Sequence, residues 1–188
     1  IHCGRCREVC PSKGKCRLCG KCIPVCPGGL IRFSGQERES EELAGKLMKN
    51  AGILKATGGG ITLTGGEVLL QPEFLLDLLG RLLPLHRAIE TSGCGDPDVF
   101  RDVLEQLELV YFDIKLMNSS LHAKYTTKSN DLILRNARIL KMSGKPFIIR
   151  IPLIRGINDD EANLKATADF LADSQNRPQV ELLPYNTM

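Results

Sequence analysis

The chain has 188 residues, of which 43% are hydrophobic and 25% are charged, enough to bury the core of one ordinary domain with or without a small extra module. Its net charge of +3 is too small to indicate a nucleic-acid-binding surface, and its apolar runs are too short and interrupted to predict a membrane-spanning helix. Composition and charge therefore exclude nucleic-acid-binding and membrane proteins as function classes, and we expect neither kind of partner.

Seven of the eight cysteines fall within the first 26 residues. A secreted scaffold would spread its cysteines over the whole fold, so we expect these to bind metal in a reducing compartment, the cytoplasm. The chain opens at Ile1 with neither an initiator Met nor an apolar signal segment, which indicates a fragment or a processed chain. Residues 1–33 are too short for a core of their own, so we expect metal to hold this ferredoxin-like module together, ahead of a larger domain over residues 34–188.

The spacing of the cysteines is that of a four-iron cluster loop. Four of them form the run C-x2-C-x2-C-x3-C followed by proline, as in bacterial ferredoxins: Cys16, Cys19, Cys22 and Cys26. Three more match the last three positions of a second copy: Cys3, Cys6 and Cys10. The pattern therefore predicts two [4Fe-4S] clusters.

Two-cluster ferredoxins share ligands between copies, because the fourth cysteine of each run binds the other cluster. One cluster is then expected on Cys10 with the first three cysteines of the second run, and the other on Cys3, Cys6 and Cys26 with a ligand outside this chain. The alternative is a pair of zinc sites, since C-x2-C pairs also bind zinc, but the repeated four-cysteine run favours iron–sulfur. Cys94 stands apart and is expected to be a small buried residue.

From Ser40 onward the sequence alternates between helix and strand patterns. Ser40 can cap a helix that ends near Gly52, and Pro72 and Pro97 open two more helices. Further helices are expected near 131–143 and 159–172, with a polar stretch before the first of them. Strands are expected at 61–64, 86–90, 109–114, 146–151 and 180–183.

These strands are apolar on both faces, which indicates parallel strands covered by helices. The expected fold class is therefore α/β, with five parallel strands and crossover helices. Such units form either an open sheet or an arc of a TIM-type barrel, and periodicity alone leaves both possibilities open.

A glycine motif follows the first of these strands. Gly65, Gly66 and Glu67 come directly after Thr64, at the carboxyl end, where parallel α/β folds bind their ligands. Adjacent glycines let the backbone approach a ligand closely, and Glu67 can accept hydrogen bonds from an ammonium group. Taken alone, a Gly-Gly-Glu sequence is more often a structural turn.

Polar residues also close the later strands. Glu90 ends the second, Asp113 and Lys115 follow the third on one side of the chain, Arg150 ends the fourth, and Asn186 follows the fifth. Each has a simpler interpretation as a capped strand or a surface ion pair. Together they predict one ligand pocket suited to a zwitterionic or carboxylate-bearing ligand.

The order of these motifs carries a resemblance. A two-cluster cysteine module followed by G-G-G-I-T-L-T-G-G-E, E-T-S-G, D-I-K-L-M, R-I-P-L-I-R-G-I-N-D and L-L-P-Y-N resembles the glycyl-radical-enzyme activating enzymes, a branch of the radical S-adenosylmethionine superfamily that includes the activating enzymes of pyruvate formate-lyase. The resemblance covers nearly the whole chain, and the order of motifs is far more specific than any one of them. It implies a partial TIM-type barrel that binds S-adenosylmethionine at a third four-iron cluster, held by C-x3-C-x2-C after the first strand.

The resemblance also implies an activity. Such enzymes reductively cleave S-adenosylmethionine and take a hydrogen from a backbone glycine of a partner glycyl radical enzyme, with electrons supplied by a flavodoxin or a ferredoxin-type donor. The expected protein is a monomeric cytoplasmic oxidoreductase of anaerobic metabolism. No C-x3-C-x2-C run exists in this chain, so the resemblance implies no catalytic residue here and a fragment that is inactive alone.

Cofactor-binding residues carry over position by position. The glycine motif is expected to bind the methionyl amino end, Glu90 to lie near that ammonium, and the residues after the third strand to contact the cofactor. Asn186 stands where relatives usually carry His. The set is Gly65, Gly66, Glu67, Glu90, Asp113, Ile114, Lys115 and Asn186.

Rival functions are a ferredoxin-type electron-transfer protein fused to a structural domain, a radical enzyme that acts on a small substrate or a peptide, and a domain that only docks with a partner. The polar strand ends argue against a simple electron carrier, which needs no second pocket.

Overall fold

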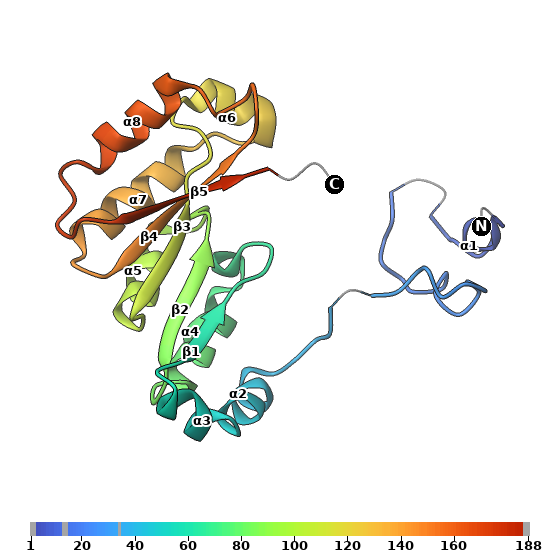
Figure 1. Ribbon diagram of the computed structural model, residues 1–188. Coiled ribbons are helices and arrows are strands. Elements are labelled where there is room, and N and C mark those ends of the chain that lie inside the picture. Colours follow the sequence, from blue (N-terminus) through green and yellow to red (C-terminus); the bar gives the residue numbers. More distant parts are fainter. Residues whose placement is uncertain (1–2, 13–14, 34, 186–188) are drawn as a thin grey trace. The chain divides into compact units, whose positions relative to one another are not determined.

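The computed structural model describes residues 3–12, 15–33 and 35–185, and it divides the chain into two compact units, residues 1–38 and 39–188 (Figure 1). This division falls a few residues beyond the boundary at residue 33 that the composition predicts. Within its described residues the first unit consists of loops and one short helix, α1 (Arg5–Glu8). Its density of cysteine, glycine and proline favours turns over regular elements.

The second unit is built on a sheet of five parallel strands, as the sequence predicts. The strands are β1 (Gly60–Leu63), β2 (His86–Thr91), β3 (Leu109–Asp113), β4 (Phe147–Leu153) and β5 (Gln179–Pro184). They lie in the sheet in sequence order, each hydrogen-bonded to the next. An arc of a barrel has this order, whereas a doubly wound sheet reverses its order at a switch point. The topology therefore decides between the two architectures in favour of the partial barrel.

Two helices precede β1, namely α2 (Ser40–Met48) and α3 (Ala51–Ala56). Helices also connect the strands, as expected of parallel pairs: the 3-10 turn η1 (Val68–Leu70), α4 (Pro72–Arg81), α5 (Pro97–Glu105), α6 (Ser119–Thr126), α7 (Asp131–Met142) and α8 (Glu161–Leu171). Asp96 caps α5 by accepting hydrogen bonds from the first-turn amides. Two local expectations were wrong: Ser40 lies inside α2 and donates its hydroxyl to Asp77 of α4, and Gly52 lies within α3 instead of ending a helix.

The core lies between the sheet and helices α4, α5, α7 and α8 (Figure 1). Side chains alternate along each strand, so one set points into this core and the next set points to the other face. Ile89, Phe112 and Ile149 belong to the core set and are fully buried. The alternate positions on the same strands carry Glu90 and Arg150, so the sheet has a polar face opposite its helices. Within the described residues, no helix is both long enough and apolar enough to cross a membrane.

A buried ion pair joins the other end of the strands. Arg87, at the start of β2, is 5% exposed and donates to both carboxylate oxygens of Glu108, which precedes β3. The same guanidinium donates to the Leu79 carbonyl of α4 at 3.1 Å. Burial alone would raise the pKa of Glu108, but the hydrogen bonds from Arg87 outweigh it and hold that pKa below its usual range. This pair fixes β2, β3 and α4 to one another at the amino end of the sheet.

Gly93 shapes the turn after β2, and we predict that Gly93→Ala destabilises the chain. Its φ is +73°, and an added Cβ would lie 2.2 Å from the ring of the fully buried Phe112. Left-handed strain and overpacking together are expected to lower the free energy of unfolding by about 2–4 kcal/mol, measured by urea denaturation. Gly45→Ala is the matched control, because that helical glycine faces open space, and it should be neutral or stabilising by up to about 1 kcal/mol. Equal stability of the two variants would contradict the role given to Gly93.

Candidate functional site

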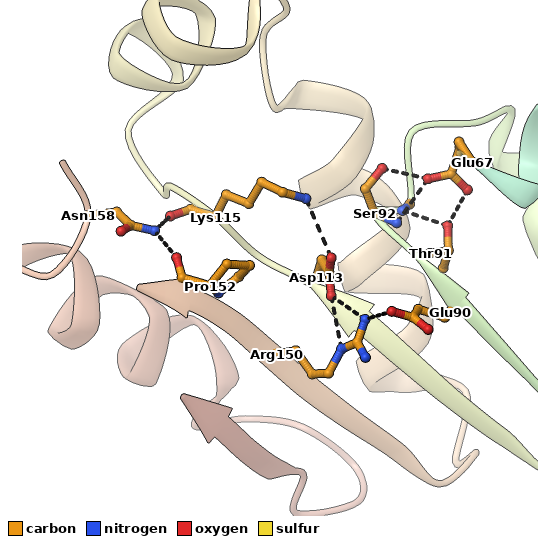
Figure 2. Close-up of polar contacts among 10 residues, drawn as sticks. Glu67, Glu90, Thr91, Ser92, Asp113, Lys115, Arg150, Pro152 and Asn158 are labelled. Carbon is orange, nitrogen blue, oxygen red and sulfur yellow. Dashed lines mark hydrogen bonds and ion pairs between the residues drawn. The ribbon is translucent and has the colours of Figure 1, made fainter. Parts of the chain in front are cut away.

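Polar side chains from four strand ends gather at one edge of the sheet (Figure 2). Glu67 follows β1, Glu90 ends β2, Asp113 ends β3 with Lys115 just beyond it, and Arg150 lies in β4. Parallel pairing places these carboxyl ends side by side, since Glu90 lies beside Tyr111 and Asp113 lies beside Arg150 in the sheet register. The predicted residue Asn186 lies outside the described residues.

The glycine turn after β1 presents an unobstructed backbone. Gly65 and Gly66 are exposed, and among the described residues none hydrogen-bonds to their backbone groups. A Cβ added to either glycine would meet nothing within 4 Å, and the φ of Gly65, +156°, is one that side chains rarely adopt. The turn therefore has room for a ligand and has free carbonyl and amide groups to bind it.

Glu67 ties this turn to the end of β2. One carboxylate oxygen accepts hydrogen bonds from the Leu69 amide at 3.2 Å and from the Thr91 hydroxyl. The other accepts from the amide and the hydroxyl of Ser92, at 2.9 and 2.6 Å (Figure 2). A carboxylate offers about four acceptor sites, so these four bonds occupy Glu67 fully. In this arrangement the carboxylate fixes the loop, and the free carbonyl groups beside it are the acceptors that a ligand ammonium can reach.

Arg150 is the centre of the polar group on β2, β3 and β4. Its Nε and Nη2 both lie 3.1 Å from Oδ1 of Asp113, and Nη2 also donates to Glu90 (Figure 2). The guanidinium carbon lies 5.6 Å from the centroid of the Tyr111 ring, within the range of a cation–π contact. The side chains of Arg150 and Asp113 are 17% and 19% exposed, so water screens this ion pair only in part.

Lys115 extends the same group toward solvent. Its Nζ lies 3.5 Å from Oδ2 of Asp113, at the limit of a hydrogen bond, and its side chain is 40% exposed. Around Arg150, the carboxylates of Glu90 and Asp113 face the cations of Arg150 and Lys115, with Arg150 held between both acids and Lys115 only loosely engaged. Glu67 adds a third carboxylate at the same edge, bound by neutral donors. Lys115 is therefore the cation best placed to pair with an anionic ligand group.

Arg150 also sets the protonation state of Glu90. Its hydrogen bond holds the pKa of Glu90 below the usual range, with a smaller contribution from the Thr64 hydroxyl, and outweighs the opposite effect of burial. Burial lowers the pKa of Arg150, but the hydrogen bonds and charges of Glu90 and Asp113 outweigh it and raise the pKa above its ordinary value. Glu90 is therefore ionised at neutral pH and occupied by Arg150.

Buried asparagines hold the loop that follows β3. Asn158 donates to the carbonyls of Lys115 and Pro152, at 2.8 and 2.7 Å (Figure 2). Asn163 accepts from the Met117 amide at 2.9 Å, and Asn130 donates to the Met117 carbonyl at 2.9 Å. Sequence reasoning missed these residues, although Asn158 lies inside the R-G-I-N-D motif. The signal available in the sequence was an asparagine beside a glycine turn, because such an asparagine, when buried, must hydrogen-bond to backbone groups.

An open hollow of about 560 Å³ lies along the β1 side of the second unit. Its lining includes the glycine turn and Glu67, together with apolar residues of α2 and α4 such as Leu43, Leu47 and Phe74. Glu90, Asp113, Lys115 and Arg150 do not line it. The glycine turn is thus the element that the hollow shares with the polar strand ends.

The cysteines of the first unit surround two separate hollows. One, of about 110 Å³, is lined by Cys10, Cys16, Cys19 and Cys22. The other, of about 610 Å³, is lined by Cys3, Cys6 and Cys26. These are the two groups into which the ligand-sharing pattern divides the seven cysteines, and all seven are free thiols. Among the described residues, no three His, Cys, Asp or Glu side chains converge on a single metal ion. The ligands of a four-iron cluster need not converge in this way, because they surround the cluster. The division of the cysteines between two hollows therefore fits four-iron clusters. The ligand assignment stays a prediction.

Backbone amides favour the thiolate form of Cys26, the form that binds metal. The Leu30 amide lies 3.3 Å from Sγ of Cys26, and this bond, joined by those of neighbouring amides, holds the pKa of Cys26 below its usual value against the opposite effect of burial. The Leu18 amide lies 3.4 Å from Sγ of Cys16. The donor set and its amide contacts thus fit thiolate-ligated clusters. Cys94 instead is half-buried and packs against the core of the second unit.

Comparisons with known proteins give a consistent result. Residues 10–169 match the family described as the Radical SAM superfamily. The choline trimethylamine-lyase activating enzyme of Oleidesulfovibrio alaskensis is 34% identical over an alignment of 209 positions, which covers 100% of this chain and 67% of that protein. The trans-4-hydroxy-L-proline dehydratase activating enzyme of Clostridioides difficile is 36% identical over 204 residues, 99% and 67% of the two chains. The (2S)-3-sulfopropanediol dehydratase activating enzyme of Klebsiella oxytoca is 37% identical over 186 residues, 90% and 59%.

The chain thus spans about three fifths to two thirds of the length of these curated relatives. Among solved structures, a domain of a pyruvate-formate lyase-activating enzyme from Bacteroides vulgatus superposes with a TM-score of 0.63 at 42% identity, covering 68% of this chain and 81% of that one. SuiB of Streptococcus suis, solved with S-adenosylmethionine, superposes with a TM-score of 0.66 at 13% identity, covering 84% and 36%, and this likeness concerns the fold alone.

We predict that Arg150→Gln raises the pKa of Glu90 toward its ordinary value, because the charged donor that favours its ionised form is lost. A lowered folded-state pKa contributes stability above the unfolded pKa, and that contribution disappears as pH falls through the folded pKa. The variant should therefore be less stable than the wild type near neutral pH, by about 1–2 kcal/mol, and the difference should shrink in acid. Carboxylate-detected NMR and urea denaturation measure the two quantities. Arg101→Gln, which removes an exposed pair with Asp98, is the control and should change neither. An unchanged Glu90 pKa in Arg150→Gln would contradict the pairing.

Proposed function

The chain belongs to the radical S-adenosylmethionine superfamily and, within it, to the glycyl-radical-enzyme activating enzymes, and from that premise we propose that its second unit binds S-adenosylmethionine at the carboxyl ends of β1 to β4. The observation that carries this proposal is the open glycine turn beside a polar edge that holds both carboxylates and cations. That edge offers an acceptor surface for an ammonium and a loosely engaged cation for a carboxylate. An amino-acid end group requires both of these.

Each residue has a definite task in this proposal. The carbonyls of Gly65 and Gly66 accept from the methionyl ammonium, and Glu67 holds their loop in place through Thr91 and Ser92. Lys115 pairs with the methionyl carboxylate, while Glu90 and Asp113 orient Arg150 and offset its charge. Ile114 is buried and donates its amide to the Arg150 carbonyl at 3.0 Å, which fixes the strand end. Asn186 remains a proposed cofactor contact.

S-adenosylmethionine and a reduced four-iron cluster together supply, when bound, the radical that takes a hydrogen from a glycine. We propose that the parent protein uses it to activate a partner glycyl radical enzyme, in line with relatives named as activating enzymes of lyases and dehydratases. We further propose that it is a cytoplasmic monomer that receives electrons from a flavodoxin or a ferredoxin-type protein. An electron carrier alone is disfavoured, because it needs no open glycine turn.

The cysteine-rich unit is proposed to hold two [4Fe-4S] clusters. The division of its thiols between two hollows supports this number, with one further ligand for the Cys3, Cys6 and Cys26 group coming from outside this chain. The cluster that meets S-adenosylmethionine would be a third one. Since no C-x3-C-x2-C run is present, we assign no catalytic residue to the 188 residues.

Binding of S-adenosylmethionine to the full chain tests the main proposal. We expect measurable binding by equilibrium dialysis with labelled cofactor, reduced about tenfold or more by Gly66→Val, because the side chain fills the space above the turn. Lys115→Met should weaken binding about tenfold through loss of the carboxylate partner. Gly45→Ala and Lys124→Met are the matched controls on exposed helical positions and should bind as the wild type does. A wild-type chain that binds no cofactor would refute the proposal.

Iron content tests the cluster proposal. After anaerobic reconstitution with iron and sulfide, we expect about eight irons per chain. Cys19→Ser should lose about half of this iron, because it removes one ligand from one cluster only. Cys94→Ser, a cysteine of the second unit, should retain all of it. Stoichiometric zinc in place of iron, or equal iron in Cys19→Ser and Cys94→Ser, would rule the assignment out.

A further inference from the structure

The positive charge of the chain is concentrated in the first unit. Residues 1–38 contain eight Lys and Arg against Glu8 and Glu37, a net charge of +6. The remaining residues contain 17 Lys and Arg against 20 Asp and Glu, a net charge of −3. The mild overall charge of +3 therefore conceals two units of opposite sign. A strongly cationic unit of this size produces a local field that attracts anionic partners.

Most of the cations that the structure describes in this unit have no acidic partner there. Six of them are exposed and form no ion pair with any residue in the described parts of the chain: Arg5, Arg7, Lys15, Arg17, Lys21 and Arg32. Some exposed cations on the helices of the second unit are paired instead, Arg81 with Asp77 at 2.8 Å and Lys165 with Asp169 at 3.0 Å. Paired charges largely cancel at a distance, whereas unpaired charges of one sign add. The six cations of the first unit therefore add to one positive field.

An apolar side chain lies among these cations. Leu18 is 73% exposed and has a φ of +52°, in the left-handed region that costs a leucine about 1–2 kcal/mol. It lies in the loop that carries Cys16 and Cys19, next to Arg17. An exposed apolar centre with a charged rim is the usual composition of a protein-binding surface. Leu18 lies at the exposed rim of the hollow that Cys10, Cys16, Cys19 and Cys22 line.

We propose that the loop Lys15–Lys21, with Leu18 at its centre and its three cations around it, docks an acidic electron-transfer protein. This rests on the proposed function, to which it adds the place where electrons enter. The loop carries two cysteines of the predicted cluster group, so a protein bound here lies beside the redox centre. In the exchange the donor protein is oxidised by one electron and the cysteine-rich unit is reduced by one. Weak, charge-steered interfaces with a small apolar centre are typical of such encounters.

A nucleic acid is the less suitable occupant of this loop. Single-strand binding relies on aromatic side chains for stacking, and the segment from Lys15 to Lys21 contains none. Bound clusters with their thiolates add negative charge to the unit as a whole, so the field at the loop comes mainly from its own cations, Lys15, Arg17 and Lys21.

The test is binding of a purified acidic flavodoxin to the full reconstituted chain, measured by biolayer interferometry at about 20 mM and about 500 mM NaCl. We expect salt-sensitive binding that the double variant Arg17→Glu/Lys21→Glu weakens about tenfold or more at low salt. Leu18→Asn, which tolerates the left-handed backbone, should weaken it about threefold at both salt concentrations. The matched control is Lys124→Glu/Lys128→Glu, two exposed cations of the second unit, and should stay within about twofold of the wild type. Iron content confirms that each variant retains its first unit.

The proposal is overturned if the Arg17→Glu/Lys21→Glu variant binds flavodoxin as tightly as the wild type, or if the control variant loses as much affinity. It is also overturned if a short RNA duplex binds more tightly than flavodoxin and displaces it from the same loop. Binding of S-adenosylmethionine, measured in the same variants, should be unchanged because it occurs in the second unit. Loss of cofactor binding in the wild type with docking intact would refute the proposed function alone, and the reverse result would refute only this inference.

Discussion

The contact between Arg150 and the carboxylates of Glu90 and Asp113 is the constraint on which the polar edge of the sheet depends. It joins β2, β3 and β4 at their carboxyl ends, as Glu67 joins the turn after β1 to the end of β2. Both links require the observed register, because a slip of one residue turns every side chain to the opposite face. A site assembled from four separate strands is therefore as precise as the pairing of the sheet beneath it. The position of Lys115 depends on these contacts, because it follows Asp113 by two residues.

The two ends of the sheet use the same chemistry for different purposes. At the amino end, Arg87 is 5% exposed and its bonds to Glu108 and the Leu79 carbonyl leave no space for a ligand. At the carboxyl end, the Arg150 group is half-open, and Lys115 beside it is only loosely paired. Ion pairs at the amino end of a barrel serve stability, whereas those at the carboxyl end lie where ligands bind. The charged side chains at the carboxyl end are thus more exposed and less completely paired than those at the amino end.

Much of this architecture follows from local sequence signals. Strands such as β3 and β4 are short, mostly apolar runs that adjoin helices with clear periodicity, so their existence and parallel direction were predictable. The polar face that Glu90 and Arg150 give to the sheet was not expected from strands interpreted as apolar on both faces. Helix α6 was missed because its polar sequence has little periodicity and is set by the Asn118 cap and the contacts of its surroundings. The pairing of Arg150 with Glu90 joins residues 60 positions apart, and no local pattern specifies which acid it will meet. The hydrogen bonds of Glu67 with Thr91 and Ser92 join residues 24 and 25 positions apart, and no local pattern specifies them either. A direct contact of Glu67 with the cofactor ammonium stays a prediction.

The two units differ in the sign of their net charge, and this difference suits them to different kinds of recognition. Around Arg150 the second unit pairs its cations with carboxylates, which leaves no excess positive charge in the site to attract unrelated anions. In the first unit six exposed cations form no ion pair with any described residue, so selection of a partner there needs only a complementary field and a small apolar contact. A strongly cationic site in the second unit would compete for the same acidic protein. The second unit therefore recognises its ligand by shape and hydrogen bonds, and the first unit recognises its partner by charge. Because the two kinds of recognition lie on separate units, each can be selective without interfering with the other.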